Sequence, residues 1–76
     1  MNINLLFLIK KEEQFKELEL ALQKLKPEQQ TCVRLFYLDN KSYQDIVEET
    51  GFELKKVKSY IQNGKRNLQI IMEQNN

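Results

Sequence analysis

Apolar residues recur along this chain every three or four positions, which is the period of an amphipathic α-helix. In residues 11–26 the repeat places one set of apolar side chains on a single face: Phe15, Leu18, Leu22 and Leu25. Acidic residues come early in this segment and lysines come late, as the helix dipole favours. The pattern predicts a first amphipathic helix.

The sequence PEQQTCVRLFYL, residues 27–38, predicts a second helix. Proline lacks a backbone N–H and suits the first position of a helix, where Pro27 stands. The apolar side of this helix consists of Cys32, Leu35 and Phe36. The polar run Asp-Asn-Lys, residues 39–41, ends the helix.

A short third helix is predicted after this break. Ser42 is followed three positions later by Asp45, which is a capping-box pattern. The shared face of this helix consists of Tyr43, Ile46, Val47 and Thr50. Gly51 ends it, because a glycine adopts the left-handed backbone of a helix end without a Cβ clash.

A long fourth helix begins about three residues later, with Glu53 at the capping position. Its apolar stripe consists of Leu54, Val57, Ile61, Leu68 and Met72. A joint this short forces the two helices to cross steeply, with Ile46, Phe52 and Val57 packed between them. We therefore expect an all-α, four-helix domain with a C-terminal helix-turn-helix and no winged elements.

The face of the long helix opposite this stripe is cationic and polar. It presents Lys55, Ser59, Gln62 and Arg66, with Lys56, Lys58 and Asn63 on its flanks. A helix in a DNA major groove needs cations on its margins for phosphates, and side chains with donors and acceptors toward the base edges. This pattern favours DNA binding, whereas Tyr60 lies toward the apolar stripe and is predicted to belong to the core.

The length, charge distribution and residue types of the chain limit the kinds of function that it can have. The 76 residues suit one small domain with a modest core. The formal net charge is +1, but residues 1–50 carry seven basic and nine acidic groups, giving −2, and residues 51–76 carry five and two, giving +3. This polarity is typical of a domain that meets phosphates at one end. The chain has one cysteine, Cys32, and no histidine, so no intramolecular disulfide and no zinc site of the usual ligand types is expected. It also has no glycine-rich phosphate loop, and its carboxylates are scattered over solvated helix faces, so we expect no metal, cofactor or catalysis.

The first residues form an apolar run, INLLFLI, at positions 3–9. It is too short to span a bilayer and lacks the features of a leader peptide, so a cytoplasmic protein without membrane contact is expected. We divide the chain into an N-terminal extension or linker remnant, residues 1–11, and a helix-turn-helix domain, residues 12–76. Ile70 falls on the polar side of the long helix, and one hypothesis is that it is covered by Leu5, Leu6, Phe7 or Leu8.

The segments ALQKLKPEQQTCVRLFYL and SYQDIVEETGFELKKVKSYIQNGKRNL carry a resemblance to a known family. Together they resemble region 4 of the extracytoplasmic-function sigma factors, particularly the form common in Bacteroidetes bacteria. The resemblance covers roughly residues 18–70 and all four predicted helices. Two positions depart from the family pattern, because Glu53 replaces a small capping residue and Val47 replaces an alanine.

The resemblance implies a domain that binds the -35 promoter element and docks by its other side on the β-subunit flap of RNA polymerase. It implies base-edge contacts by Lys58, Ser59, Gln62 and Asn63. It places Lys55, Lys56 and Arg66 nearer the DNA backbone. Ser42 and Tyr43 would anchor a phosphate at the start of the short helix.

Other functions remain open at this point. The output domain of a response regulator has a similar architecture and would bind symmetric half-sites with a second copy of itself. A protein-interaction module captured by an anti-sigma factor is a further alternative. The family also has a separate domain for the -10 element that these residues do not contain, so the chain is either a truncated sigma factor or a stand-alone relative.

Overall fold

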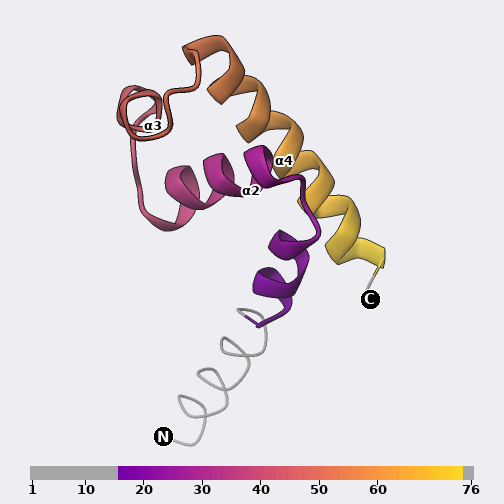
Figure 1. The fold of residues 1–76 in the computed structure, drawn as a ribbon. Coiled ribbons are helices and arrows are strands. Elements are labelled where there is room, and N and C mark those ends of the chain that lie inside the picture. The colour runs from indigo at the N-terminus through magenta and orange to yellow at the C-terminus, as the bar shows by residue number, and fades with distance from the viewer. Residues whose placement is uncertain (1–15, 75–76) are drawn as a thin grey trace, which may run out of the picture.

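Residues 16–74, the part of the chain that the computed structural model describes, form helices joined by short turns (Figure 1). Residues 16–23 are helical and are followed by four further elements: α2 (Pro27–Val33), η1 (Arg34–Leu38), α3 (Tyr43–Thr50) and α4 (Leu54–Gln74). The predicted all-α fold with a C-terminal helix-turn-helix is confirmed. The predicted N-terminal extension, its suggested contact with Ile70, and Phe15 all lie outside the described residues.

Two helix boundaries differ from the prediction. The first helix ends at residue 23, so Leu25 lies in the turn before α2, where it is nevertheless buried. The second helix begins at Pro27 as predicted, but after Val33 it widens into a π-helical turn, η1. In this turn the N–H of Asp39 donates to the carbonyl of Arg34 at 3.1 Å, and Asn40 then takes a left-handed backbone with φ of 54°.

Most of the buried apolar residues in the described part of the chain form two clusters, both of which contact α4. The first contains Cys32, Ile46, Val57 and Ile61. The second contains Leu22, Leu25 and Val33, with Leu68 and Ile71 packed against it. Helix α2 therefore contributes to the core on two sides, since Cys32 belongs to one cluster and Val33 to the other. Burial also raises the pKa of the Cys32 thiol.

The joint between α3 and α4 has the predicted geometry. Gly51 has a left-handed backbone with φ of 77°, and residues 51–53 connect the two helices. Ile46 and Val57 are completely buried between them. In Figure 1, α3 is seen almost end-on while α4 runs across the picture, so the two helices are steeply inclined. Tyr60 packs on the first core cluster as expected, 5.4 Å from the Phe52 ring between centroids.

The apolar stripe of α4 differs from the prediction at two positions. Leu54 was assigned to the core, but 43% of it is exposed, because it lies at the first residue of α4. Gly64 was not assigned to the core, but it is buried, and an added Cβ would lie 2.6 Å from Cγ2 of Val33. The glycine therefore permits a close approach of α2 and α4.

Candidate nucleic-acid interface

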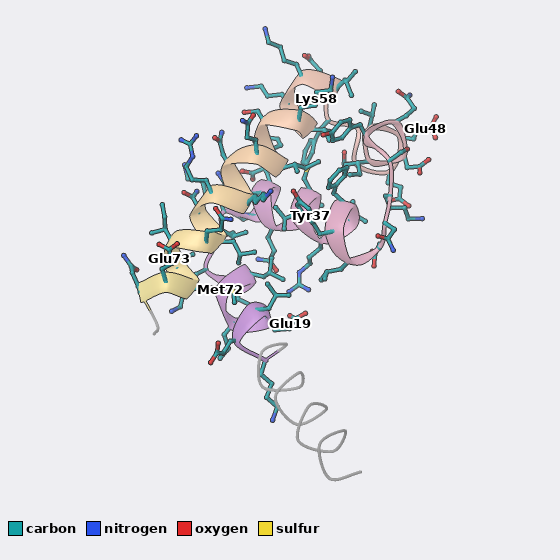
Figure 2. The ribbon with its side chains drawn as sticks, turned by 180° about the vertical axis from the view of Figure 1, so that it is seen from behind. Glu19, Tyr37, Glu48, Lys58, Met72 and Glu73 are labelled. Atoms are coloured by element: carbon teal, nitrogen blue, oxygen red, sulfur yellow. The ribbon has the colours of Figure 1, made fainter. Side chains whose placement is uncertain are left out.

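The residues that the sequence assigned to DNA lie on two adjoining elements, the start of α3 and the N-terminal two-thirds of α4. All of them are exposed: Ser42, Tyr43, Lys55, Lys56, Lys58, Ser59, Gln62, Asn63 and Arg66. On α4 they face away from Val57, Ile61 and Gly64, which are buried. The steep joint thus presents this face of α4 to solvent. Figure 2 shows Lys58 at the end of α4 near α3, and Met72 and Glu73 at the opposite end.

The structure brings the α3 and α4 parts of this face together at Tyr43. The Nζ atom of Lys58 lies 5.5 Å from the centroid of the Tyr43 ring, within the range of a cation–π interaction. Tyr43 is itself stacked on Phe36, with 5.0 Å between centroids and 9° between planes. Lys58 therefore lies on the margin of α4 that faces α3.

Two of the predicted base-contacting side chains also contact each other. The Nδ2 atom of Asn63 donates a hydrogen bond of 3.2 Å to the Oγ of Ser59. Both are exposed, and they lie one helical turn apart on α4. The amide oxygen of Asn63 and the hydroxyl proton of Ser59 remain available, so the pair presents an acceptor and a donor side by side.

The start of α3 is closed by a complete capping box. The N–H of Asp45 donates to the Ser42 hydroxyl at 3.1 Å, and the N–H of Ser42 donates to the Asp45 carboxylate at 3.2 Å. Hydrogen bonding from Ser42, chiefly from its backbone N–H, lowers the pKa of the Asp45 carboxyl group. The stabilising effect of this carboxylate is therefore complete above the ordinary pKa of an aspartate and is lost as the pH falls through the lower folded value. The phosphate site predicted at Ser42 and Tyr43 would therefore share this helix start with a carboxylate.

Replacing Ser42 with alanine tests how far this cap holds α3 in place. We expect Ser42→Ala to lower the free energy of unfolding by about 1 kcal/mol, because the N–H of Asp45 loses its acceptor. Chemical denaturation of both proteins at neutral pH measures the difference. Ser42→Asn, which keeps a capping oxygen, should stay close to the original protein, and equal losses in both variants would contradict the capping role.

Charge on the described residues is divided between paired and unpaired groups. The ion pairs in the described part of the chain are Arg34 with Glu19, at 2.7 Å, and Lys41 with Glu49, at 3.6 Å. Within residues 16–74, none of the cations that the sequence assigned to DNA takes part in an ion pair. The Glu19 pKa is lowered because two nitrogen atoms of Arg34 donate to its carboxylate. The positive charge of α4 is therefore available to an external anion.

Two residues beside this face, Lys65 and Tyr37, were not predicted from the sequence. The Nζ atom of Lys65 lies 6.0 Å from the centroid of the Tyr37 ring. Helical periodicity alone would have found Lys65, because it follows Lys58 by seven positions on the same edge of α4. Tyr37 gave no such signal, because it comes from η1, and only the folded chain places it against α4.

Within the described part of the chain, no helix is both long enough and apolar enough to cross a membrane. A comparison with curated proteins found no match, and neither did a comparison with solved structures.

The family of sigma-70, region 4, matches residues 15–68, which is well over half of the chain. The matched segment contains η1 and α3, the joint at Gly51, and α4 up to Leu68. The chain belongs to the sigma-70 region 4 family. It is therefore a helix-turn-helix, DNA-binding domain of the sigma-factor type, which acts in transcription initiation.

Proposed function

We propose that this domain recognises the -35 element of a promoter by placing the outward face of α4 in the major groove. The observation that supports this most directly is the steep α3–α4 pair, which leaves the cationic, amide-bearing face of α4 exposed and free of ion pairs within residues 16–74. We also propose that this domain belongs to a sigma factor of the extracytoplasmic-function type, which its sequence resembles.

Different side chains of this face suit different parts of the DNA. Ser59, Gln62 and Asn63 carry both donors and acceptors and point away from the core, so we assign them to base edges. Lys55, Lys56 and Arg66 lie beside them and suit phosphates, which position the protein without carrying sequence information. Lys58 belongs to the same exposed face, although its contact with Tyr43 draws it toward the margin.

The proposal includes docking on RNA polymerase, at the β-subunit flap, by a surface that begins beside the DNA face, at Tyr37 and Lys65, and extends to the first helical segment. An apolar groove of 280 Å³ supports it. Its walls include Leu18 and Leu22 from the first helical segment, Leu38 from η1, and Met72 from α4. A partner side chain of matching apolar character would bury this surface from water. Polymerase would also raise the local concentration of the domain at the promoter.

Selection from a pool of random duplexes, with the domain tethered to polymerase, tests the proposed recognition. We expect a single asymmetric consensus, because one copy of the domain would contact one site. Recovery of two symmetric half-sites would instead indicate a domain that binds as a dimer, as response-regulator output domains do. A pool that remains random would contradict sequence recognition.

Alanine substitution of the base-facing amides gives a finer prediction. Gln62→Ala and Asn63→Ala should each weaken binding to the selected site by about 1–3 kcal/mol and relax the preference at one base pair, because a base-edge hydrogen bond is lost. Titration of each variant against the selected duplex and a scrambled duplex measures both effects.

Lys55→Gln is the matched control for these two variants. Its loss should be equal on both duplexes, because a phosphate contact is independent of sequence. Equal losses on both duplexes for Gln62→Ala and Asn63→Ala as well would count against base contacts by these amides.

A further inference from the structure

Beside the outward face of α4, the structure has a hollow of 390 Å³ whose walls are basic and aromatic. Ile61 and Gln62 line it from α4, Lys58 and Lys65 stand on the same helix, and Tyr37 and Tyr43 line it from η1 and α3. Ile61 is buried and belongs to the core, whereas the two lysines are exposed. The hollow thus has an apolar floor and a positively charged rim.

Both lysines of this hollow lie over tyrosine rings that contact Phe36, and Phe36 packs against the core. Phe36 packs against the first core cluster and stacks on Tyr43, and its ring meets the Tyr37 ring edge-on at 4.9 Å between centroids. Lys58 lies over Tyr43 and Lys65 over Tyr37, at 5.5 and 6.0 Å from the ring centroids. Their ammonium groups are therefore less free than those of lysines that extend into solvent.

The spacing of these cations suits an extended polyanion. Lys58 and Lys65 are seven positions apart, which is about 10 Å along a helix at 1.5 Å per residue. Within residues 16–74 neither forms an ion pair with a carboxylate. Gln62, which lies between them, belongs to both the hollow and the outward face of α4. A strand whose bases meet α4 would therefore pass its backbone across the hollow.

We infer that Lys58, Lys65 and the hydroxyl groups of Tyr37 and Tyr43 form a binding site for the sugar–phosphate backbone of a DNA strand. This site extends the interface from α4 onto η1, and it rests on the proposed DNA binding. It assigns Lys58 to the backbone and not to a base edge. Tyr37 has two roles in this site: its ring positions Lys65, and its hydroxyl donates a hydrogen bond to a phosphate oxygen.

The salt dependence of binding to a duplex of random sequence tests the site without knowledge of the promoter. Each neutralised phosphate contributes a slope of about −0.9 to log K against log salt. We expect Lys65→Gln and Lys58→Gln each to reduce the steepness by about 0.9. Because backbone contacts carry no sequence information, the same reduction should occur on unrelated duplexes.

Two further variants separate this site from a general effect of charge or folding. Lys24→Gln removes the same charge from an exposed lysine that does not line the hollow, and its slope should equal that of the original protein. Tyr37→Phe keeps the ring and removes the hydroxyl, so the affinity should fall about two- to tenfold while the slope stays the same. Circular dichroism of each variant checks that the helices are retained.

The outcomes distinguish the site from the proposed function. If the original protein shows no salt-dependent binding to any duplex, the proposed function fails, and the site fails with it. If the original protein binds but Lys65→Gln and Lys58→Gln keep its slope, the backbone site is overturned while DNA binding stands. A loss of slope in Lys24→Gln equal to that in Lys65→Gln would also overturn it, because the effect would then reflect net charge alone.

Discussion

Gly64→Ala should lower the free energy of unfolding by about 1–3 kcal/mol, because a well-packed contact has no room for an added methyl group. The methyl group would lie 2.6 Å from Cγ2 of Val33 and 3.3 Å from Cβ of Gln29. Helix propensity acts in the opposite direction, because alanine is favoured over glycine by about 0.8–1.0 kcal/mol inside a helix. The sign of the measured change therefore shows whether α2 and α4 are in contact here.

A double-mutant cycle with Val33→Ala isolates this contact. Val33→Ala alone should be destabilising, because it removes buried methyl groups from the second core cluster. In the Val33→Ala background, however, Gly64→Ala should lose most of its destabilising effect, because Cγ2 of Val33, the atom nearest to the added methyl group, is gone. Urea denaturation of the four proteins measures the coupling. A stabilising Gly64→Ala in the original background would contradict the close approach of the two helices.

The close contact between Gly64 of α4 and Val33 of α2 also affects function, because it sets the position of α4 relative to the rest of the domain. Gly64 lies on the buried side of α4, opposite the face that carries Lys55, Gln62 and Arg66. The first helical segment, α2 and α4 all contribute to the second core cluster and to the apolar groove, and η1 completes the groove. Moving α4 away from α2 would therefore displace the DNA face from the surface proposed to meet polymerase.

The parts of the fold that could be predicted from the sequence are those with local chemical signals. Pro27 begins α2 because proline fits a helix start, and Ser42 with Asp45 caps α3 through hydrogen bonds three residues apart. Gly51 ends α3 because its backbone is left-handed. These signals act within a few residues, so a single sequence contains all the information they need. The class of the domain and the exposed position of the polar face of α4 follow from them.

The features that could not be predicted depend on contacts between distant elements. Periodicity assigns one apolar face to a helix, but α2 packs on two sides, so Val33 was missed beside Cys32. Leu54 continues the apolar stripe to the first residue of α4, where its side chain is 43% exposed. Gly64 has no side chain and so no hydrophobic signal. Tyr37 meets Lys65 only because η1 and α4 come together in the fold.

Ile46→Ala should lower the free energy of unfolding by about 2–5 kcal/mol, which is the usual range for truncating a buried Ile or Leu. Ile46 is completely buried, and it joins α3 to Cys32 of α2 and to Val57 and Ile61 of α4. The loss is large beside the total of about 5–15 kcal/mol that is typical of a folded domain. Salt-dependent duplex binding should weaken with it, because α3 and the joint hold α4 outward.

Leu20→Ala is the matched control, because this leucine is 60% exposed and its truncation should change stability by no more than about 0.5 kcal/mol. Thermal and chemical denaturation of both variants give the comparison, and duplex titration below each melting transition separates lost folding from lost contacts. Binding by Ile46→Ala should recover as the temperature is lowered, because none of its proposed DNA contacts has been removed. Equal stability of the two variants would mean that α3 is not anchored through Ile46, and that the exposed face of α4 does not depend on this helix pair.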